Sequence, residues 1–227
     1  MNDSRDSKMG TIRNVLLVDD HEVMRLGLAQ LIAQEPDLGV CGEAEDVASA
    51  LKAIERLTVD IAVVDISLKD SYGIDLVKEI QDRWPSLPVL VLSMHDESFY
   101  AERVLRAGAR GYVTKAEASS KVIEGIRKVL DGGVYVSEAM SAKMLTKLVG
   151  SHGDRARFPI DTLSDREFEV FELIGQGLKT RQIAQRLHLS TKTIDAHREH
   201  IKKKLKLETA TDLLMYAVQW AQFDREA

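Results

Sequence analysis

Two hydrophobic periodicities alternate along the first 135 residues, and this pattern constrains the fold more than any other feature of the chain. Short, nearly continuous apolar runs occur at 14–18, 38–44, 61–64, 89–92 and 111–113. Between them, and once after the last, apolar residues recur at spacings of three and four, which is typical of amphipathic helices. Strands buried on both faces that alternate with helices predict a parallel sheet covered on both sides. We therefore expect an α/β doubly wound, flavodoxin-like domain with five parallel strands.

The pattern ends at Gly132-Gly133, and the rest of the chain contains no further strand signal. Ser137 can cap a helix that runs to about Leu148, and the polar segment 150–159 has the composition of a linker. Four helical segments follow, at 164–176, 180–187, 191–205 and 209–223. The expected organisation is a flexible tail (1–11), the α/β domain (12–133), a linker helix with a flexible linker (134–160) and a small all-α four-helix domain (161–227).

Composition narrows the class of protein. Hydrophobic residues make up 44% of the 227 residues and charged residues 30%, a balance that excludes a disordered or fibrous chain. The apolar runs are far shorter than the roughly 20 residues that span a bilayer, and the first ten residues lack the apolar stretch of a secretory signal. Only one cysteine is present, Cys41, which fits a reducing cytosol. We expect a cytoplasmic protein with no membrane partner.

Charge is distributed unevenly along the chain. The whole chain carries 31 − 36 = −5, and residues 1–153 carry 18 − 24 = −6. Residues 154–227 carry 13 − 12 = +1, but the stretch 179–206 alone carries 9 − 2 = +7. A local basic region on an acidic protein favours contact with a polyanion such as nucleic acid.

Polar residues gather where the expected strands end. Asp19 and Asp20 follow the first strand, Asp65 the third, Ser93 the fourth and Lys115 the fifth. In doubly wound folds, sites form at the carboxyl ends of the strands, and clustered carboxylates suit Mg²⁺. A carboxylate can also form an acyl phosphate, whose oxygens a lysine and a hydroxyl would contact. Any one of these residues alone could cap a helix or form a surface ion pair, but the five together favour a phosphoryl site.

The segments VLLVDDHEVMRLGL, VVDISLKDSYGIDLV, VLVLSMHDE and GARGYVTK resemble the motifs of response-regulator receiver domains over residues 12–131. The resemblance implies that Asp65 is the phosphoacceptor. It also implies that Mg²⁺ is bound by the side chains of Asp20 and Asp65 and by the backbone carbonyl of Ser67. Asp19 would lie beyond these ligands and would not bind the ion itself. Ser93 would be the switch hydroxyl, Tyr112 the switch aromatic and Lys115 the cation that contacts the phosphoryl group.

Three neighbours of these motifs have weaker interpretations. Lys69-Asp70 stands where the family usually has Pro-Gly, which leaves the expected site intact but changes the loop beyond Asp65. His21 follows the acidic pair and is interpreted as a capping or surface residue, because imidazole is a poor partner for Mg²⁺. Met94, beside the switch hydroxyl, either packs or restricts access to the phosphoryl group.

The basic region centres on the helix expected at 191–205. Its residues Ile194, Ile201 and Leu205 share one face, while the opposite face is small or charged and suits the DNA major groove. A three-residue turn, 188–190, joins it to the preceding helix, as in a helix-turn-helix. The expected DNA contacts are Lys179, Thr180, Arg181, Thr191, Lys192, Thr193, Asp195, Ala196, Arg198, Glu199, Lys202 and Lys203. The alternative is a solvated basic face that binds nothing.

The segment LSDREFEVFELIGQGLKTRQIAQRLHLSTKTIDAHREHIKKKL resembles the LuxR-type helix-turn-helix. Together with the receiver resemblance, it identifies the chain as similar to NarL/FixJ-type response regulators. Members of that family dimerise through the last helix, which implies a dimer interface at Leu213, Ala217 and Trp220. Trp220 could instead close the core of its own domain. Glu199 either accepts a hydrogen bond from a cytosine or pairs with Lys203 four residues on.

The resemblance implies a two-component transcription regulator rather than an enzyme. A sensor histidine kinase would phosphorylate Asp65 with Mg²⁺ as cofactor, and the phosphorylated chain would bind a double-stranded DNA operator as a homodimer. Two alternatives remain open at this point. One is a regulator that binds DNA without phosphorylation. The other is a Mg²⁺-dependent phosphatase or phosphotransferase that uses Asp65 as a nucleophile, which would leave residues 161–222 without a role.

Overall fold

The structure is a computed structural model that describes residues 11–68, 72–149 and 159–226. Its first part is a five-stranded, fully parallel sheet of order β2-β1-β3-β4-β5. The strands are β1 (Arg13–Val18), β2 (Leu38–Ala44), β3 (Ile61–Asp65), β4 (Val89–Ser93) and β5 (Gly111–Thr114). The prediction of a doubly wound parallel sheet is confirmed, and β3 and β4 each extend one residue further than expected, to end on Asp65 and Ser93.

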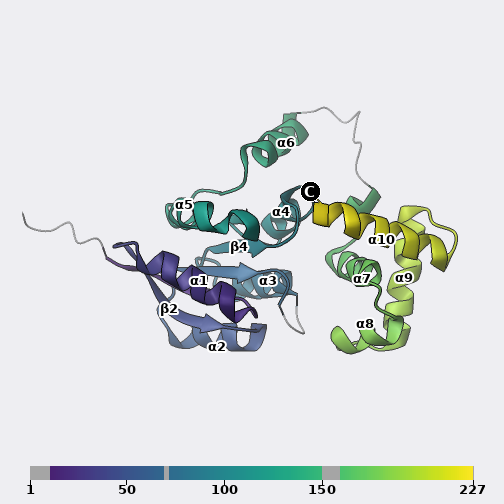
Figure 1. Ribbon diagram of the computed structural model, residues 1–227, viewed down its shortest axis with the longest axis horizontal. Helices are drawn as coiled ribbons and strands as arrows, with labels where there is room; N and C mark the ends of the chain where they lie inside the picture. The colour runs from purple at the N-terminus through teal and green to yellow at the C-terminus, as the bar shows by residue number, and fades with distance from the viewer. Residues whose placement is uncertain (1–10, 69–71, 150–158, 227) are drawn as a thin grey trace, which may run out of the picture.

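Helices cover both faces of this sheet (Figure 1). Side chains of β1 and β3 that point to one face pack with α1 (Glu22–Ala33) and α5 (Ala118–Leu130), and those that point to the other pack with α2 (Val47–Arg56), α3 (Gly73–Arg83) and α4 (Glu97–Arg106). The strands are buried on both sides, which is why their sequences are apolar without alternation. A short 3₁₀ turn, η1 (Lys115–Glu117), joins β5 to α5.

The chain leaves the sheet through a bridge between Gly111 and Tyr135 and enters α6 (Glu138–Val149). Ser137 caps this helix by accepting a hydrogen bond from the amide of Met140, and Met140 is buried in the core that contains α4. The helix thus agrees with the expected start at Ser137 and lies on the α/β domain (Figure 1). The segment expected as a flexible linker lies outside the described residues except for Pro159.

The helical domain contains η2 (Pro159–Thr162), α7 (Asp165–Gly175), α8 (Thr180–Arg186), α9 (Thr191–Leu205) and α10 (Ala210–Glu226). Ser164 and Glu167 form a capping box at the start of α7. All eight residues from 167 to 174 are buried, although a helix of a three- or four-helix pack normally buries one face. The reason is that α7 packs against α9 and α10 on one side and lies against the α/β domain on the other (Figure 1).

No helix in the described ranges is long and apolar enough to cross a lipid bilayer.

Candidate functional site

An acidic pocket lies at the carboxyl ends of β1, β3 and β5, as the strand-end residues predicted. Asp19 follows β1, Asp65 ends β3 and Lys115 follows β5, and all three are buried. Gly73 begins α3 so close to the end of β3 that an added Cβ would lie 2.1 Å from the carbonyl oxygen of Asp65. A residue without a side chain is therefore needed there to bring α3 against the pocket.

Lys115 joins two of the carboxylates. Its Nζ lies 2.7 Å from Oδ2 of Asp65 and 2.6 Å from Oδ2 of Asp19. The other oxygen of Asp65 accepts a hydrogen bond of 3.1 Å from the backbone amide of Ser67, so Ser67 lies beside the carboxylate of Asp65. Oδ1 of Asp19 accepts from the amide of His21 at 2.8 Å. The pocket thus holds a buried cation between buried anions, with its carboxylates fixed by the backbone that follows each strand.

Burial and charge act in opposite directions on the two partners. Burial raises the pKa of Asp65, and Lys115 only partly offsets this effect. Burial would also lower the pKa of Lys115, but the carboxylates of Asp65 and Asp19 outweigh it, so the pKa of Lys115 lies above its usual value. Lys115 is therefore firmly protonated, and Asp65 is a carboxylate whose charge is poorly stabilised by its surroundings. Such a group gains from any further cation placed beside it.

Oxygen ligands for a hard cation are available beside Lys115. Asp19, Asp20, His21 and Asp65 each bring a ligand atom within 4.8 Å of the others. Oδ1 of Asp20 is buried and accepts no hydrogen bond, although Nδ1 of His21 lies 3.0 Å away. Mg²⁺ prefers oxygen ligands, so it fits a site that is rich in carboxylates and contains a buried carboxylate oxygen that accepts no hydrogen bond. His21 itself is exposed, in agreement with its interpretation as a capping or surface residue.

The two switch residues expected from the motifs lie beside the pocket and meet at one position, His95. Ser93 is fully buried, and its Oγ accepts a hydrogen bond of 3.1 Å from the amide of His95. Tyr112 is buried in β5, and its hydroxyl donates to the carbonyl oxygen of His95 at 2.8 Å. Met94, which lies between Ser93 and His95 in the chain, is 72% exposed, so it does not pack in the core. His95 was not among the predicted site residues, and its only signal in the sequence is its place two residues after Ser93.

Residues expected to contact DNA are carried by α8 and α9, and most are exposed. Ser190 caps α9 by accepting from the amide of Thr193, and Ile194, Ile201 and Leu205 turn into the core of the domain, as the periodicity predicted. The exposed members of the expected set are Lys179, Arg181, Thr191, Lys192, Asp195, Ala196, Glu199 and Lys203, and the half-buried ones are Thr180, Thr193, Arg198 and Lys202. The basic surface of α9 thus faces solvent.

Glu199 has a different partner from the one considered. Its Oε1 lies 2.9 Å from Nζ of Lys202, three residues on, rather than from Lys203. The exposed fraction of the Glu199 side chain is 70%, so this ion pair leaves the carboxylate open to solvent.

The expected dimer interface on α10 needs correction. Leu213 and Ala217 are completely buried inside the helical domain, where α10 packs against α7, so they have no surface to offer a second copy. Among the side chains of α10 that the structure describes, the large apolar ones that are exposed are Leu214 and Met215. Periodicity alone could not tell these two apolar faces of the helix apart. Trp220 contacts Phe168 and Phe171 of its own domain, in agreement with the alternative that it closes the core of that domain.

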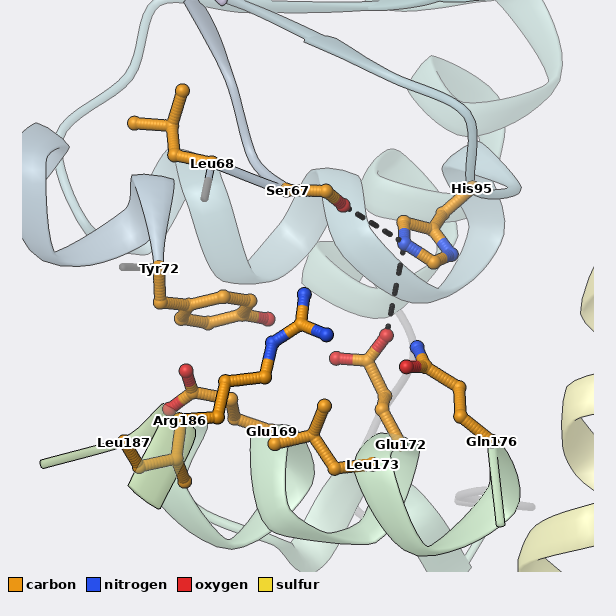
Figure 2. A pocket seen from close by; sticks show the side chains of 10 residues that line it. All are labelled: Ser67, Leu68, Tyr72, His95, Glu169, Glu172, Leu173, Gln176, Arg186 and Leu187. Atoms are coloured by element: carbon orange, nitrogen blue, oxygen red, sulfur yellow. Dashed lines mark hydrogen bonds and ion pairs between the residues drawn. The ribbon is translucent and has the colours of Figure 1, made fainter. Parts of the chain in front are cut away.

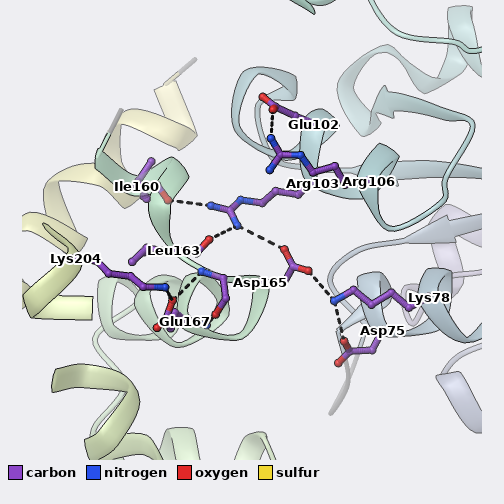
Figure 3. Close-up of polar contacts among 11 residues, drawn as sticks. Asp75, Lys78, Glu102, Arg103, Arg106, Ile160, Leu163, Asp165, Glu167 and Lys204 are labelled. Atoms are coloured by element: carbon purple, nitrogen blue, oxygen red, sulfur yellow. Dashed lines mark hydrogen bonds and ion pairs between the residues drawn. The ribbon is translucent and has the colours of Figure 1, made fainter. Parts of the chain in front are cut away.

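The two domains are in contact, and no pattern in the sequence predicted this arrangement. Arg103 of α4 donates to the carbonyl oxygens of Leu163 and Ile160, each at 2.9 Å (Figure 3). Its guanidinium group also lies over the ring of Phe168. On α3, Nζ of Lys78 lies 2.6 Å from Oδ2 of Asp165. Trp220 also contacts two aromatic residues of α4, Phe99 and Tyr100. The start of α7 is therefore anchored on α3 and α4.

A cavity of about 80 Å³ remains between the domains (Figure 2). The α/β domain lines it with Ser67, Tyr72 and His95, and α7 with Glu169 and Glu172. The hydroxyl of Tyr72 is buried there without a hydrogen bond. Burial raises the pKa of Glu169, and Arg166 opposes the shift only in part. This part of the interface buries polar groups that are incompletely paired, so the free energy that favours domain contact is reduced here.

Comparisons with known proteins match both domains. Residues 15–127 match the family model of the response regulator receiver domain, and residues 161–217 match that of bacterial regulatory proteins of the luxR family. The oxygen regulatory protein NreC of Staphylococcus carnosus is 31% identical over 90% of this chain and 96% of its own length. The transcriptional regulatory protein DegU of Brevibacillus brevis is 28% identical over 90% and 92%.

Solved structures of similar architecture include RcsB from Salmonella. One structure of RcsB from Salmonella typhimurium is 26% identical, with a TM-score of 0.71 over 92% of this chain and 98% of the other. Another, RcsB from Salmonella enterica serovar Typhimurium bound to the promoter rprA with the phosphomimetic BeF3⁻, is 27% identical, with a TM-score of 0.68 over 92% and 99%. The paired domains, the strand-end acidic pocket and these full-length matches show that the chain belongs to the NarL/FixJ-type response regulators, transcription regulators with a receiver domain and a LuxR-type DNA-binding domain.

Proposed function

We propose that a sensor histidine kinase transfers a phosphoryl group to Asp65, and that this modification controls binding of the chain to double-stranded DNA. The observation that carries the proposal is the position of Asp65: a buried carboxylate at the end of β3, with Nζ of Lys115 at 2.7 Å. The chain would act in the cytoplasm, where operator DNA is found. The receiver domain would span 12–133 and the DNA-binding domain 161–227, joined by the segment 134–160.

Asp65 is suited to act as the nucleophile. An oxygen of its carboxylate would form a bond to phosphorus while the bond from phosphorus to the donor's imidazole nitrogen breaks and that nitrogen keeps the electron pair. The product adds negative charge to a pocket that already holds three carboxylates. Lys115 can compensate this added negative charge, because its ammonium can leave Asp19 and hydrogen-bond to a phosphoryl oxygen.

Mg²⁺ would be held by the side chains of Asp20 and Asp65 and by the backbone carbonyl of Ser67. When bound, it would screen the charge of the phosphoryl oxygens during transfer. Asp19 would keep the ligands in place through its contacts with Lys115 and the amide of His21. The buried oxygen of Asp20 that accepts no hydrogen bond supports this assignment.

Phosphorylation would be sensed by Ser93 and Tyr112. The Ser93 hydroxyl can turn toward a phosphoryl oxygen that is absent before transfer, and Tyr112 can follow into the space left beside it. A ligand shifts an equilibrium between two conformations only by its different affinity for each, and these new hydrogen bonds supply that difference.

The DNA-binding domain would place α9 in the major groove. Its exposed residues Lys192, Asp195, Ala196 and Glu199 would face bases, and basic residues at both ends would hold phosphates. The charge of +7 within residues 179–206 supports this assignment.

Two copies would bind paired half-sites, and we propose that the exposed Leu214 and Met215 of α10 form the dimer contact in place of the buried Leu213 and Ala217. Leu214→Lys should then weaken binding to paired half-sites and leave binding to one half-site unchanged.

Labelling with acetyl phosphate and Mg²⁺ tests the proposal. The chain should take up one phosphate per molecule, with the lability to acid and base of an acyl phosphate. Asp65→Asn keeps the volume of the side chain but removes the nucleophile, so it should take up none. Asp82→Asn, which alters an exposed carboxylate of α3, is the matched control and should label fully. Unchanged labelling of the Asp65→Asn variant would refute the assignment.

A further inference from the structure

His95 connects the phosphorylation site to the DNA-binding domain. Its backbone amide donates to Ser93 Oγ at 3.1 Å, and its carbonyl oxygen accepts from the hydroxyl of Tyr112 at 2.8 Å. Both switch residues therefore hold the backbone of this one residue. A change in the position of either side chain removes a hydrogen bond from His95.

The side chain of His95 reaches the other domain (Figure 2). Its Nε2 lies 3.3 Å from Oγ of Ser67 and 3.7 Å from Oε1 of Glu172 on α7. The ring stacks on Tyr100, with centroids 4.5 Å apart and planes 19° apart, and the hydroxyl of Tyr100 donates to the same oxygen of Glu172. Glu172 is 6% exposed, and these receiver side chains help to compensate the charge of its buried carboxylate. We call His95, Tyr100 and Glu172 the His95 cluster.

We infer that the His95 cluster is the contact that couples phosphorylation to release of the DNA-binding domain. The inference rests on the proposed role of Asp65. When Ser93 turns toward a phosphoryl oxygen, its hydroxyl no longer accepts from the amide of His95, and movement of Tyr112 frees the carbonyl. His95 then loses the position from which it contacts Glu172. Glu172 is then a buried carboxylate with fewer partners, which is unfavourable, so the closed arrangement is destabilised and the domains separate.

The other anchors of the interface have no such connection. Arg103 and Lys78 hold Asp165 and the carbonyl oxygens of Ile160 and Leu163, and none of the hydrogen bonds or ion pairs described for them involves Ser93, Tyr112 or the acidic pocket. Their contribution to the free energy of the closed arrangement is therefore the same whether or not Asp65 is phosphorylated. Among the described residues, the His95 cluster is hydrogen-bonded to the switch residues, whereas the contacts of Arg103 and Lys78 are not. This difference makes the coupling residue experimentally separable from the anchors.

Coupling is reciprocal. Closure of the domains and the phosphorylated arrangement would require different positions of His95. A variant that breaks the His95 cluster and shifts the equilibrium from closed to open domains should therefore also bind a phosphoryl mimic more tightly, by the same factor. Glu172, a residue of the DNA-binding domain, would in this way set the affinity of a site in the receiver domain. No contact between Glu172 and Asp65 is needed for this effect.

The test measures domain separation in the full chain. Cysteines introduced at Lys52 of α2 and Gln219 of α10, both exposed, carry a pair of spin labels in a Cys41→Ala background. The distance distribution is recorded with and without beryllofluoride and Mg²⁺, and the dissociation constant for beryllofluoride is measured in parallel. The parent should be closed alone and open with beryllofluoride.

Tyr100→Phe, which removes a hydrogen-bond donor from the buried carboxylate of Glu172, should be largely open without beryllofluoride, should change little when it is added and should bind it roughly fivefold or more tightly than the parent. Glu172→Gln, which removes the buried charge itself, should stay largely closed when beryllofluoride is added. Lys78→Met, the matched control, removes an anchor and should still change its distance distribution on addition of beryllofluoride. If Glu172→Gln and Tyr100→Phe respond to beryllofluoride as fully as the parent, the inference is wrong. Failure of the parent to bind beryllofluoride would instead refute the role of Asp65, so the two claims are tested separately. Retention of the parent's circular dichroism in each variant excludes misfolding as the cause.

Discussion

Nζ of Lys115 lies 2.7 Å from Oδ2 of Asp65, so the lysine that would contact a phosphoryl group already pairs with the residue that would carry it. The same ammonium is 2.6 Å from Asp19. The cation therefore serves two states of the receiver domain: it compensates the buried carboxylates before phosphorylation, and it is in reach of the phosphoryl oxygens afterwards.

The first prediction follows from the resting role of Lys115. Lys115→Met leaves two buried carboxylates without their cation, which should lower the free energy of unfolding by about 3–5 kcal/mol. Urea denaturation measures the loss, and Mg²⁺ should recover part of it by occupying the same pocket. Lys121→Met, which removes an exposed ion pair with Glu117, should cost less than about 1 kcal/mol. Equal and small costs in the two variants would contradict the account of the pocket.

The second prediction concerns Ser93. Ser93→Ala should still take up phosphate on Asp65, because the nucleophile and the carboxylates that would hold Mg²⁺ remain, but phosphorylation should no longer increase DNA binding. Phosphate labelling and fluorescence anisotropy on operator DNA measure the two steps separately. Ser119→Ala, at an exposed position of α5, should behave as the parent in both. A Ser93→Ala protein that binds DNA on phosphorylation as strongly as the parent would show that the switch role is wrong.

The third prediction separates base recognition from phosphate contact on α9. If Glu199 accepts a hydrogen bond from a cytosine, Glu199→Gln should relax the preference at one base pair per half-site, a discrimination of about 1–3 kcal/mol. Lys203→Ala should weaken binding to all sequences alike and reduce the salt slope by about 1. If Glu199→Gln instead tightens binding to every sequence equally, Glu199 only forms the ion pair with Lys202 seen in the structure.

The fourth prediction concerns pH. Burial would raise the pKa of Glu167, but hydrogen bonds from Lys204 and Ser164 outweigh it, so the pKa lies below the usual value of 4.5. A lowered pKa contributes stability that is fully present above pH about 4.5 and is lost as the pH falls through the folded-state value. Glu167→Gln should therefore flatten the loss of stability of the DNA-binding domain on acidification below that pH. Urea unfolding followed by Trp220 fluorescence, in a Trp84→Phe background, measures the effect.

Glu169 provides a control of opposite sign on the same helix. Burial raises its pKa above 4.5, so its contribution is present below pH about 4.5 and is lost as the pH rises through the folded-state value. Glu169→Gln should remove that decline on the alkaline side. The same direction of change in both variants would contradict the assignment of the two carboxyl groups.

The sequence predicted the site within each domain more fully than the relation between the domains. Apolar runs and strand-end residues located Asp19, Asp65 and Lys115, because the carboxyl ends of parallel strands meet at one edge of a sheet. Periodicity also gave the bounds of α9. These features are local, or follow from a fold with few alternatives, and each leaves a recognisable pattern in the chain.

The domain interface left no such pattern. His95 and Glu172 are 77 positions apart in the chain, and neither stands in a motif that requires the other. The one available signal was that the apolar residues of α7, including Phe168, Val170 and Phe171, spread over more than half of its circumference, which indicates a helix covered on more than one side. On α10 the difficulty was the reverse: two apolar faces were present, and only packing against α7 showed that Leu213 and Ala217 belong to the core.

The central claim is that a phosphoryl group on Asp65 controls DNA binding, and one measurement tests it most directly. An operator is first obtained by selection of bound fragments from random DNA, and the affinity of the full chain for it is then measured by fluorescence anisotropy with and without beryllofluoride and Mg²⁺. The account predicts that beryllofluoride tightens binding roughly tenfold or more in the parent and has no effect on the Asp65→Asn variant. Equal affinity of the parent in both conditions, or an equal gain in the Asp65→Asn variant, would contradict it.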